Sequence, residues 1–353
     1  MRPFSHSLLL LGLGALAHAS QKWGPSKFTS LVTFGDSYTD DTRVSYFYNH
    51  NGSAPPVGWV EPITNDSASG GYIWGHYVKE YASLSHRYNY AVSGASCSNH
   101  ITPRTTSFGL YPSVLEYQVP AFKADFSYTV PSTGEKFLSI APNETIFAIW
   151  IGTNDLGNYA FLTDSQVPNK TIPDYIDCVY EALDGVYATG AAKYFVIMNV
   201  VPLQLAPLYA TPENGGIGEN NYWPDKGGNL TEISYRMWEQ VATVNDVYGY
   251  RTPVEWLVRR RYPGAEVAVM DMYGLISDIY YNPSQYLNGS APANVTGYDH
   301  HCNVAGTECQ TLPSPDSFLW YDQLHPSERT DQVIAEEFVK VVRGESRYAM
   351  YWS

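Results

Sequence analysis

The feature that most limits what this chain can fold into is its alternation of short β-prone runs with longer helical patterns. Apolar, β-branched or aromatic runs predict buried strands at residues 28–34, 145–151, 194–201 and 266–270, with a shorter strand at 88–92. Helical spacing predicts helices at 73–84, 175–187, 231–259 and 328–342, with a break in the third at Pro253 as an alternative. Strands that alternate with helices form a parallel sheet covered on both faces, so we expect an α/β protein.

Three of the predicted strands end in glycine beside polar side chains. The end segments are GDS at 35–37, SGA at 93–95 and GTND at 152–155. One such junction is ordinary loop chemistry. Because parallel sheets bind ligands at the carboxyl ends of their strands, three of them predict one shared crevice that contains Ser37.

A candidate base for a nucleophilic serine lies near the end of the sequence. Asp322 precedes His325 by three residues, directly upstream of the last predicted helix. A turn there would bring the carboxylate to one imidazole nitrogen and leave the other facing a serine. The dipole of the helix that begins near Ser327 would favour the neutral imidazole that a general base requires. Taken alone, this spacing is a weak motif that favours a structural role over a catalytic one.

The N-terminal segment has the pattern of a secretory signal peptide. Arg2 is followed by the apolar stretch 8–16 and by AHA at 17–19, which matches a cleavage site. We therefore expect residues 1–19 to be removed and the secreted chain to start near Ser20. Seven N-x-S/T sequons agree with passage through a glycosylating pathway: Asn51, Asn65, Asn143, Asn169, Asn229, Asn288 and Asn294.

The composition is typical of an extracellular globular protein. Of 353 residues, 44% are hydrophobic and 16% are charged, which is enough for a large core. The formal net charge of -14 provides no basic face for a polyanion, so we expect no nucleic-acid partner. No segment after the signal peptide reaches the ~20 apolar residues of a membrane span. Without a linker or repeat, residues 20–353 are expected to form one domain and a soluble monomer.

The four cysteines are expected to form two disulfides, because their number is even and the secretory compartment is oxidising. Three pairings are open. We favour Cys302 with Cys309, since the loop between them is short and rich in Gly and polar residues, which leaves Cys97 with Cys178. The run HHC at 300–302 matches no zinc spacing, so we expect no metal.

Four segments together resemble the sequence blocks of the GDSL or SGNH hydrolases. They are FGDS at 34–37, the segment around Gly94, GTND at 152–155 and DQLH at 322–325, in the order of that family. The resemblance covers nearly the whole mature chain. It implies a three-layer α/β/α sandwich with a parallel five-stranded sheet, similar to flavodoxin, and chemistry without a cofactor.

The same resemblance implies roles for individual residues. Ser37 matches the nucleophile, His325 the base and Asp322 the acid that orients the base. The backbone N–H groups of Ser37 and Gly94 and the side-chain amide of Asn154 match the donors of the oxyanion hole. The chain contains no G-x-S-x-G, which disfavours the nucleophile elbow of the α/β-hydrolases.

Within this superfamily, GDSY at 35–38 and YDQLHPS at 321–327 look most like the fungal acetylesterases of carbohydrate esterase family sixteen. The resemblance implies a secreted serine esterase that deacetylates small hemicellulose-derived saccharides. Tyr38 stands where leucine gives the GDSL motif its last letter, and as a hypothesis it narrows the acyl side of the pocket. Trp59 and Trp320 are candidates for stacking on sugar rings, although aromatic residues belong more often to the core.

Two other functions remain open. A secreted lipase or lysophospholipase would use the same triad, but it would be expected to show an apolar lid or acyl groove, and no segment indicates one. A non-catalytic carbohydrate-binding protein on the same fold would be expected to have lost at least one catalytic position. All five positions are intact: Ser37, Gly94, Asn154, Asp322 and His325.

Overall fold

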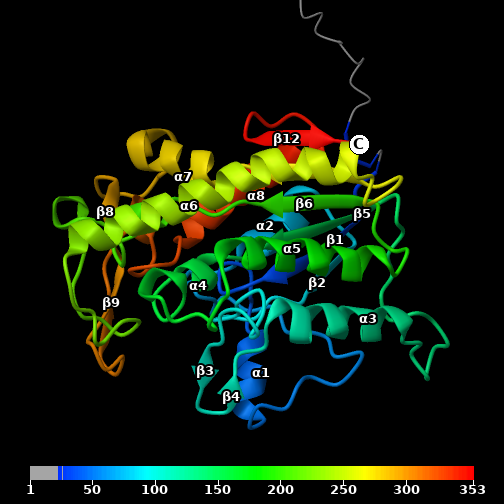
Figure 1. The fold of residues 1–353 in the computed structure, drawn as a ribbon, viewed down its shortest axis with the longest axis horizontal. Helices are drawn as coiled ribbons and strands as arrows, with labels where there is room; N and C mark the ends of the chain where they lie inside the picture. Colours follow the sequence, from blue (N-terminus) through cyan, green and yellow to red (C-terminus); the bar gives the residue numbers. More distant parts are fainter. Residues whose placement is uncertain (1–22, 26) are drawn as a thin grey trace, which may run out of the picture.

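The computed structural model describes residues 23–25 and 27–353 (Figure 1). At its centre is a six-stranded sheet with the order β12-β7-β6-β5-β1-β2. Its strands are β1 Ser30–Gly35, β2 His86–Asn89, β5 Thr145–Trp150, β6 Tyr194–Met198, β7 Glu266–Met270 and β12 Ala349–Trp352. The predicted signal peptide, residues 1–19, lies outside the described residues.

The parallel part of the sheet confirms the predicted α/β architecture. Five strands run parallel, and counted along the chain they lie in the order 2-1-3-4-5 of flavodoxin-like folds. The central strands β1, β5 and β6 are buried throughout, because helices cover both of their faces. The sixth strand, β12, pairs antiparallel with β7 and was not predicted.

Helices form one layer on each face of the sheet (Figure 1). On one face, α2 (Trp74–Tyr81) packs against α8 (Glu328–Val342). On the other lie α3 (Val119–Ser127), α5 (Ile172–Tyr187) and α6 (Leu230–Pro253). The two layers and the sheet between them are the expected three-layer sandwich.

Local chemistry sets the ends of these helices. Thr171 and Asp174 form a capping box at the start of α5, and Ser327 caps α8 by accepting a backbone N–H of its first turn. Pro253, which has no N–H to donate, ends the α-helical hydrogen bonding of α6, and a π-helical turn, Val254–Val258, continues the chain.

Shorter elements fill the connections between the layers. The helices are α1 Arg43–Asn49, α4 Thr153–Leu156 and α7 Met272–Tyr281. The strands, which pair outside the central sheet, are β3 Thr105–Thr106, β4 Gly109–Leu110, β8 Asn294–Tyr298, β9 His300–Cys302, β10 Cys309–Thr311 and β11 Phe318–Trp320. In Figure 1, α1, β3 and β4 lie together below the sheet.

The structure contains both disulfides favoured from the sequence. Cys97, in the loop after β2, is joined to Cys178 of α5, and Cys302 is joined to Cys309. The first bridge fastens the segment that follows Gly94 to a helix of the outer layer. The second closes the β9–β10 hairpin.

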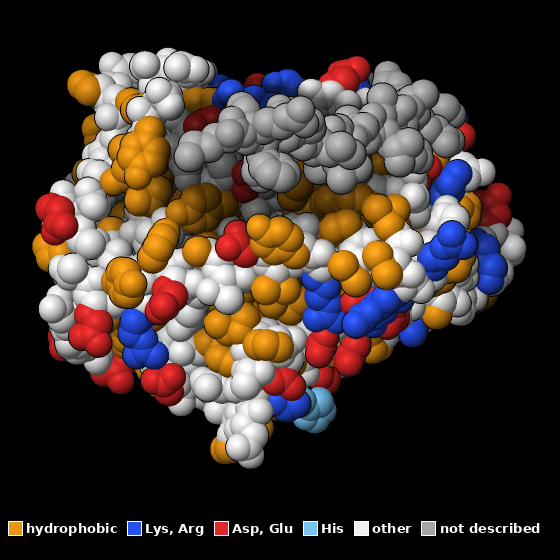
Figure 2. Space-filling view, turned by 45° about the horizontal axis from the view of Figure 1, so that its top comes forward, with side chains coloured by type: hydrophobic (Ala, Val, Ile, Leu, Met, Phe, Trp, Pro, Cys, Tyr) orange, Lys and Arg blue, Asp and Glu red, His pale blue; other side chains and the backbone are white. Residues whose placement is uncertain are grey.

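The surface leaves most sequons accessible. Six of the seven asparagines are exposed, whereas Asn294 is half-buried and accepts the backbone N–H of Gly297 at 2.8 Å. Figure 2 shows acidic, basic and hydrophobic side chains interspersed on one face. Within the described part of the chain, no helix is both long and apolar enough to cross a bilayer.

Candidate active site

The candidate nucleophile Ser37 lies in the turn that follows β1. At the end of β1, a Cβ on Gly35 would lie 2.4 Å from the carbonyl oxygen of Trp150 in β5. Only glycine therefore allows the two strands to pair this closely at their ends. The backbone N–H of Thr39 donates to the carbonyl oxygen of Asp36 at 3.0 Å and closes the turn around Ser37.

Ser37, His325 and Asp322 form a continuous hydrogen-bonded chain. Ser37 Oγ lies 2.8 Å from His325 Nε2, and His325 Nδ1 lies 2.8 Å from Asp322 Oδ2. All three side chains are buried, at 6%, 4% and 5% exposed in that order. With its Nδ1 proton directed at Asp322, His325 presents Nε2 as the acceptor for the serine proton. The structure thus brings together the three residues that the sequence predicted.

Backbone groups hold the Asp322 carboxylate in place. Its Oδ1 accepts the N–H groups of Leu324 and His325, both at 2.8 Å. Burial acts to raise the pKa of Asp322, but the charge and hydrogen bonds of His325 outweigh burial and hold the pKa below its ordinary value. The carboxylate therefore stays ionised and can stabilise an imidazolium on His325.

The predicted oxyanion donors line the same cavity as Ser37. Gly94 has a φ of +83°, and a Cβ there would lie 2.5 Å from the ring of Tyr111, so a larger residue does not fit. Within residues 23–25 and 27–353, the backbone N–H groups of Ser37 and Gly94 donate to no acceptor. Two unpaired backbone donors beside a serine hydroxyl suit a developing oxyanion.

The side-chain amide of Asn154 is oriented by two partners. Its Nδ2 donates to the carbonyl oxygen of Ala95 at 2.9 Å, and its Oδ1 accepts from the Arg104 guanidinium. An amide nitrogen carries two hydrogens, so one remains for a ligand in the cavity. Arg104 belongs to none of the sequence blocks, and nothing in the sequence indicated its role.

Asp155 anchors the loop that follows Gly94. Both of its carboxylate oxygens lie 3.1 Å from the backbone N–H of Cys97, and one accepts the hydroxyl of Thr102 at 2.7 Å. Burial raises the pKa of Asp155 to about 6. The sequence placed this residue at a strand end but gave it no role.

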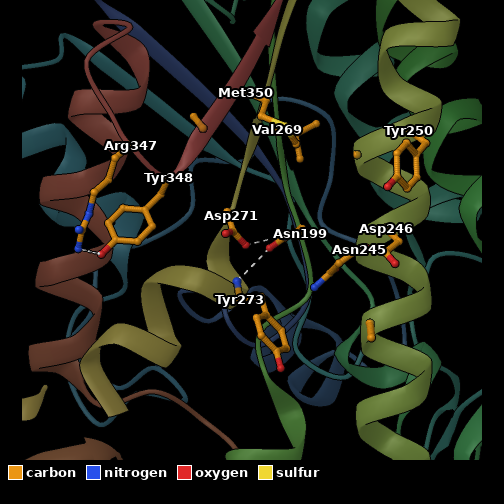
Figure 3. Close-up of a pocket in the computed structure, with 13 residues that line it drawn as sticks. Asn199, Asn245, Asp246, Tyr250, Val269, Asp271, Tyr273, Arg347, Tyr348 and Met350 are labelled. Atoms are coloured by element: carbon orange, nitrogen blue, oxygen red, sulfur yellow. Dashed lines mark hydrogen bonds between the residues drawn. The ribbon is translucent and has the colours of Figure 1, made fainter. Parts of the chain in front are cut away.

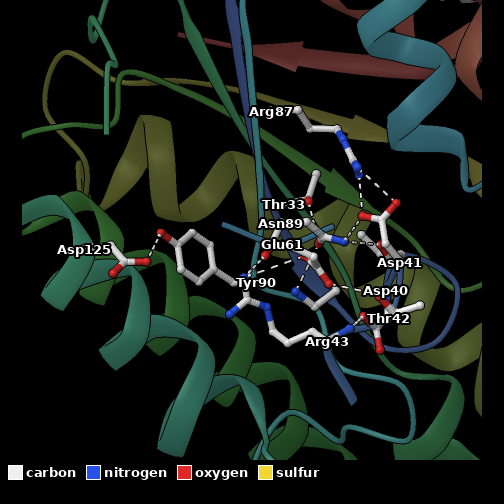
Figure 4. Close-up of polar contacts among 12 residues, drawn as sticks. Thr33, Asp40, Asp41, Thr42, Arg43, Glu61, Arg87, Asn89, Tyr90 and Asp125 are labelled. Carbon is white, nitrogen blue, oxygen red and sulfur yellow. Dashed lines mark hydrogen bonds and ion pairs between the residues drawn. The ribbon is translucent and has the colours of Figure 1, made fainter. Parts of the chain in front are cut away.

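A second buried polar network, around Asp40 and Arg43, lies beside the segment that precedes Gly94 (Figure 4). The Asp40 carboxylate accepts the backbone N–H groups of Arg43 at 2.6 Å and of Ser93 at 2.7 Å. It therefore ties the start of α1 to the residue before Gly94. The guanidinium of Arg43 donates to the carbonyl oxygen of Asn89 at 2.5 Å. Burial raises the pKa of Asp40 to about 6.

The cavity above Ser37 is small, at about 210 Å³. Drug-sized ligand sites typically measure roughly 300–1,000 Å³. Its walls are largely side chains outside the sequence blocks: Val44, Tyr48, Ala68, Tyr111, Tyr209 and Tyr222. The cavity is therefore smaller than most sites for drug-sized ligands.

A match to a known family decides what kind of protein this is. Residues 31–338 match the family described as GDSL-like Lipase/Acylhydrolase. The chain belongs to this family. This family match, together with a 42% identical acetylesterase relative, shows that the protein is a carboxylic ester hydrolase. The alternative of a binding protein without catalytic activity is therefore excluded.

Two fungal relatives of this GDSL-like hydrolase are acetylesterases. The acetylesterase of Hypocrea jecorina is 42% identical over 329 residues, which cover 92% of each chain. The acetylesterase of Thermothelomyces thermophilus is 31% identical over 196 residues, which cover 52% of this chain and 58% of that enzyme. A solved acetylxylan esterase from Geobacillus stearothermophilus matches with a TM-score of 0.39 at 14% identity, covering 91% of this chain and 96% of its own.

Three aromatic side chains of the GDSL-like hydrolase do not occupy the positions suggested for them. Trp320 is fully buried and donates its ring N–H to the carbonyl oxygen of Val295 at 3.0 Å. The guanidinium of Arg43 lies over the ring of Trp59, 5.0 Å from the ring centroid. Neither tryptophan lines the cavity. The hypothesis that Tyr38 narrows the acyl pocket is wrong, because this side chain is 1% exposed and lies outside the cavity lining.

A larger cavity of the GDSL-like hydrolase, about 550 Å³, lies between α6 and β12 (Figure 3). At its floor, Asn199 donates to Asp271 at 3.0 Å and accepts the backbone N–H of Tyr273 at 3.1 Å. The amide of Asn245 is engaged by the backbone of Val200. No residue of the Ser37 site lines this cavity, so its size does not make it the place of the chemistry.

One group of described side chains has the spacing of metal ligands: His300, Cys302 and Cys309. Both sulfurs are joined to each other in the disulfide, and His300 Nδ1 lies 2.8 Å from Thr311 Oγ1. Thiolates are the form of cysteine that binds metals, so the group is better described as a covalently closed hairpin.

Proposed function

We propose that this GDSL-like hydrolase is an acetylesterase that removes acetyl groups from acetylated hemicellulose oligosaccharides. The observation that carries the proposal is the hydrogen-bonded chain from Asp322 through His325 to Ser37, which ends at a cavity of about 210 Å³. The 42% identity to the acetylesterase of Hypocrea jecorina supports the same acyl group.

Acylation of Ser37 is the first half of the proposed reaction. His325 Nε2 takes the proton of Ser37 as the serine oxygen attacks the ester carbonyl carbon. The charge that develops on the carbonyl oxygen is met by the N–H groups of Ser37 and Gly94 and by the free amide hydrogen of Asn154. Asp322 stabilises the imidazolium until His325 returns the proton to the departing sugar oxygen.

Hydrolysis of the acetyl-enzyme is the second half. His325 takes a proton from water, which attacks the acetyl carbonyl carbon and passes through the same oxyanion hole. Collapse breaks the bond to Ser37 and releases acetate, and His325 returns the proton to the serine oxygen. Each turnover consumes one ester and one water and yields one acetate and one sugar hydroxyl.

A series of esters that differ only in acyl length tests the substrate proposal. Purified enzyme is assayed with p-nitrophenyl acetate, butyrate and octanoate, with acetylated xylo-oligosaccharides and with phospholipid vesicles. Forcing an extra methylene into a packed site costs ~1–3 kcal/mol, or roughly 5- to 150-fold in kcat/KM. We expect a steep fall from acetyl to butyryl, negligible octanoyl hydrolysis and no phospholipid turnover. Efficiency that rises with acyl length would instead support the lipase alternative.

We also propose that the enzyme is a secreted, glycosylated monomer, with residues 1–19 as its signal peptide and 20–353 as one catalytic domain. Two disulfides and six exposed sequon asparagines support this proposal. The test is expression in a fungal host. We expect the enzyme to appear in the culture medium with an N-terminus near Ser20. Its electrophoretic mobility should increase after endoglycosidase treatment, and in size-exclusion chromatography it should elute at the mass of one chain. Protein retained in the cell with Met1 intact would contradict it.

A further inference from the structure

A tyrosine hydroxyl contacts the acid of the candidate triad. Tyr222 Oη donates to Asp322 Oδ2 at 2.8 Å, and the same oxygen faces His325 Nδ1 at 2.8 Å. Tyr222 lies in the connection between β6 and α6, 100 residues before Asp322 and outside all sequence blocks. The carboxylate therefore has four donors: Tyr222 Oη, the backbone N–H groups of Leu324 and His325, and His325 Nδ1, which lies within 2.9 Å of both carboxylate oxygens.

We propose that Tyr222 is a positioning residue of the esterase site, which acts through Asp322 to set the orientation and basicity of His325. This inference rests on the proposed function, because it requires Ser37 and His325 to act as nucleophile and base. It adds a fourth side chain to the hydrogen-bonded chain that ends at Ser37.

The charge states of the two groups suit this role. Burial and the negative charge of Asp322 raise the pKa of Tyr222 well above its ordinary value, so the phenol keeps its proton and donates. Asp322 is held ionised by His325, as described above. A hydrogen bond to a charged acceptor stabilises the folded site more than a hydrogen bond between two neutral groups does.

The connection that carries Tyr222 is itself held in place. The backbone N–H of Tyr222 donates to Asn220 Oδ1 at 2.9 Å, and the backbone carbonyl oxygen of Tyr222 accepts from Asn158 Nδ2 at 3.0 Å. Gln323, the neighbour of Asp322, donates to the same Asn220 oxygen at 3.2 Å. The tyrosine and the catalytic aspartate are thus joined by side-chain and loop contacts, which fix the hydroxyl on the carboxylate.

The Tyr222 ring forms part of the cavity wall above Ser37. It is 38% exposed, and its centroid lies 5.5 Å from that of His325 at 70°. The hydroxyl donates to Asp322 while the residue stays partly exposed in the cavity wall. A saccharide over this ring would shield the Tyr222–Asp322 bond from water, which strengthens a charge-assisted hydrogen bond.

The sign of the expected pH effect follows from the shared oxygen. Loss of the Tyr222 hydroxyl leaves the negative charge of Asp322 less dispersed, so it stabilises the imidazolium form of His325 more strongly. His325 then keeps its second proton to a higher pH. The acid limb of the kcat/KM profile is therefore expected to move to higher pH in Tyr222→Phe.

The test compares Tyr222→Phe with a matched control, Tyr159→Phe. The Tyr159 hydroxyl also donates to an aspartate, Asp225, but that pair lies outside the cavity lining. With p-nitrophenyl acetate, we expect Tyr222→Phe to lower kcat by ~3- to 30-fold, with KM nearly unchanged, and to raise the pH of the acid limb by several tenths of a unit. Tyr159→Phe should leave both quantities at wild-type values.

Proton NMR gives a readout that does not depend on turnover. The Nδ1 proton between His325 and Asp322 is expected at low field, absent in His325→Ala, and shifted in Tyr222→Phe but not in Tyr159→Phe. An acid limb and a low-field resonance that both stay at wild-type values in Tyr222→Phe overturn the proposal. If Tyr222→Phe does not fold, 3-fluorotyrosine at position 222 replaces it. That stronger donor should move the acid limb to lower pH, and an unmoved limb is again a refutation.

The proposed function fails in a different way. If Ser37→Ala and His325→Ala both keep activity, the triad itself is wrong. If both are inactive while Tyr222→Phe matches Tyr159→Phe, only the role of Tyr222 is wrong.

Discussion

The hydroxyl of Tyr38 donates a 2.7 Å hydrogen bond to the carbonyl oxygen of Leu324. This bond joins the turn that carries Ser37 to the segment that carries His325. The Tyr38 ring also packs edge-on against His325, with 5.7 Å between centroids. The residue that departs from the GDSL motif thus connects the two halves of the site from within the core.

Tyr38→Phe is expected to destabilise the protein and slow catalysis. The buried Leu324 carbonyl would lose its donor, which typically costs ~1–3 kcal/mol, and the backbone beside His325 would be less well held. We expect a lower Tm by calorimetry and a reduced kcat on p-nitrophenyl acetate. Tyr235→Phe, at a tyrosine that is 59% exposed on α6, is the control and should change neither. An unchanged Tm in Tyr38→Phe would show that the bond contributes nothing.

The triad is expected to respond to mutation as a unit. Ser37→Ala and His325→Ala should each abolish esterase turnover, and the double variant should be little worse than either, because residues that act together are not additive. Asp322→Asn should cost less than loss of the nucleophile. Steady-state kinetics of all four variants decides the matter, and losses that multiply would argue against a shared mechanism.

Asn154→Ala tests the oxyanion hole. Loss of one donor typically lowers kcat by ~10²–10³-fold, and KM should change little if the amide acts only on developing charge. Arg104→Met keeps the amide but removes the guanidinium that orients it, so we expect a smaller loss of kcat. A variant Asn154→Ala that raises KM alone would place the amide in ground-state binding instead.

The raised pKa of Asp36 leads us to expect that the free energy of unfolding decreases as the pH rises. Burial raises its pKa to about 7, and its Oδ2 is among the described buried atoms without a hydrogen-bond partner. Between about pH 4 and 7 the folded protein keeps a proton that the unfolded chain has lost, so the free energy of unfolding decreases with pH across this window. Asp36→Asn should therefore raise Tm at pH 8 and leave it nearly unchanged at pH 4. Equal shifts at both pH values would contradict the raised pKa.

The two disulfides are expected to differ in what they contribute. Their cysteines are separated by 81 and 7 residues. In the chain-entropy model, these loops correspond to ~4.5 and ~2.4 kcal/mol. Replacing Cys97 and Cys178 with serine should lower the midpoint of urea unfolding about twice as much as replacing Cys302 and Cys309. Equal effects would show that loop length does not govern their contribution.

The sequence predicted elements well where apolar periodicity was strong. The strand at 266–270 and the helix at 328–342 have the bounds that were expected. The strand expected at 88–92 begins earlier, at His86, because pairing with Ser30 of β1 sets its register. The edge strand β12 was missed, since its place depends on pairing with β7 far back in the chain.

The same distinction applies to the candidate site. Ser37, Asp322 and His325 stand in short recognisable blocks, and the structure brings them into one hydrogen-bonded chain. Arg104 and Tyr222 lie in irregular connections with no periodicity or motif. Only the folded geometry reveals that they contact Asn154 and Asp322.

The distance along the chain between Ser37 and His325 bears on when the enzyme becomes active. The two residues are 288 positions apart. At a synthesis rate of ~5–20 residues per second, the ribosome adds the base roughly 15–60 s after the nucleophile. A nascent chain therefore displays its serine without its base for most of its elongation. Ester hydrolysis is a property that such a chain acquires only in its last moments of synthesis, when nearly all of its other structural elements have already been made.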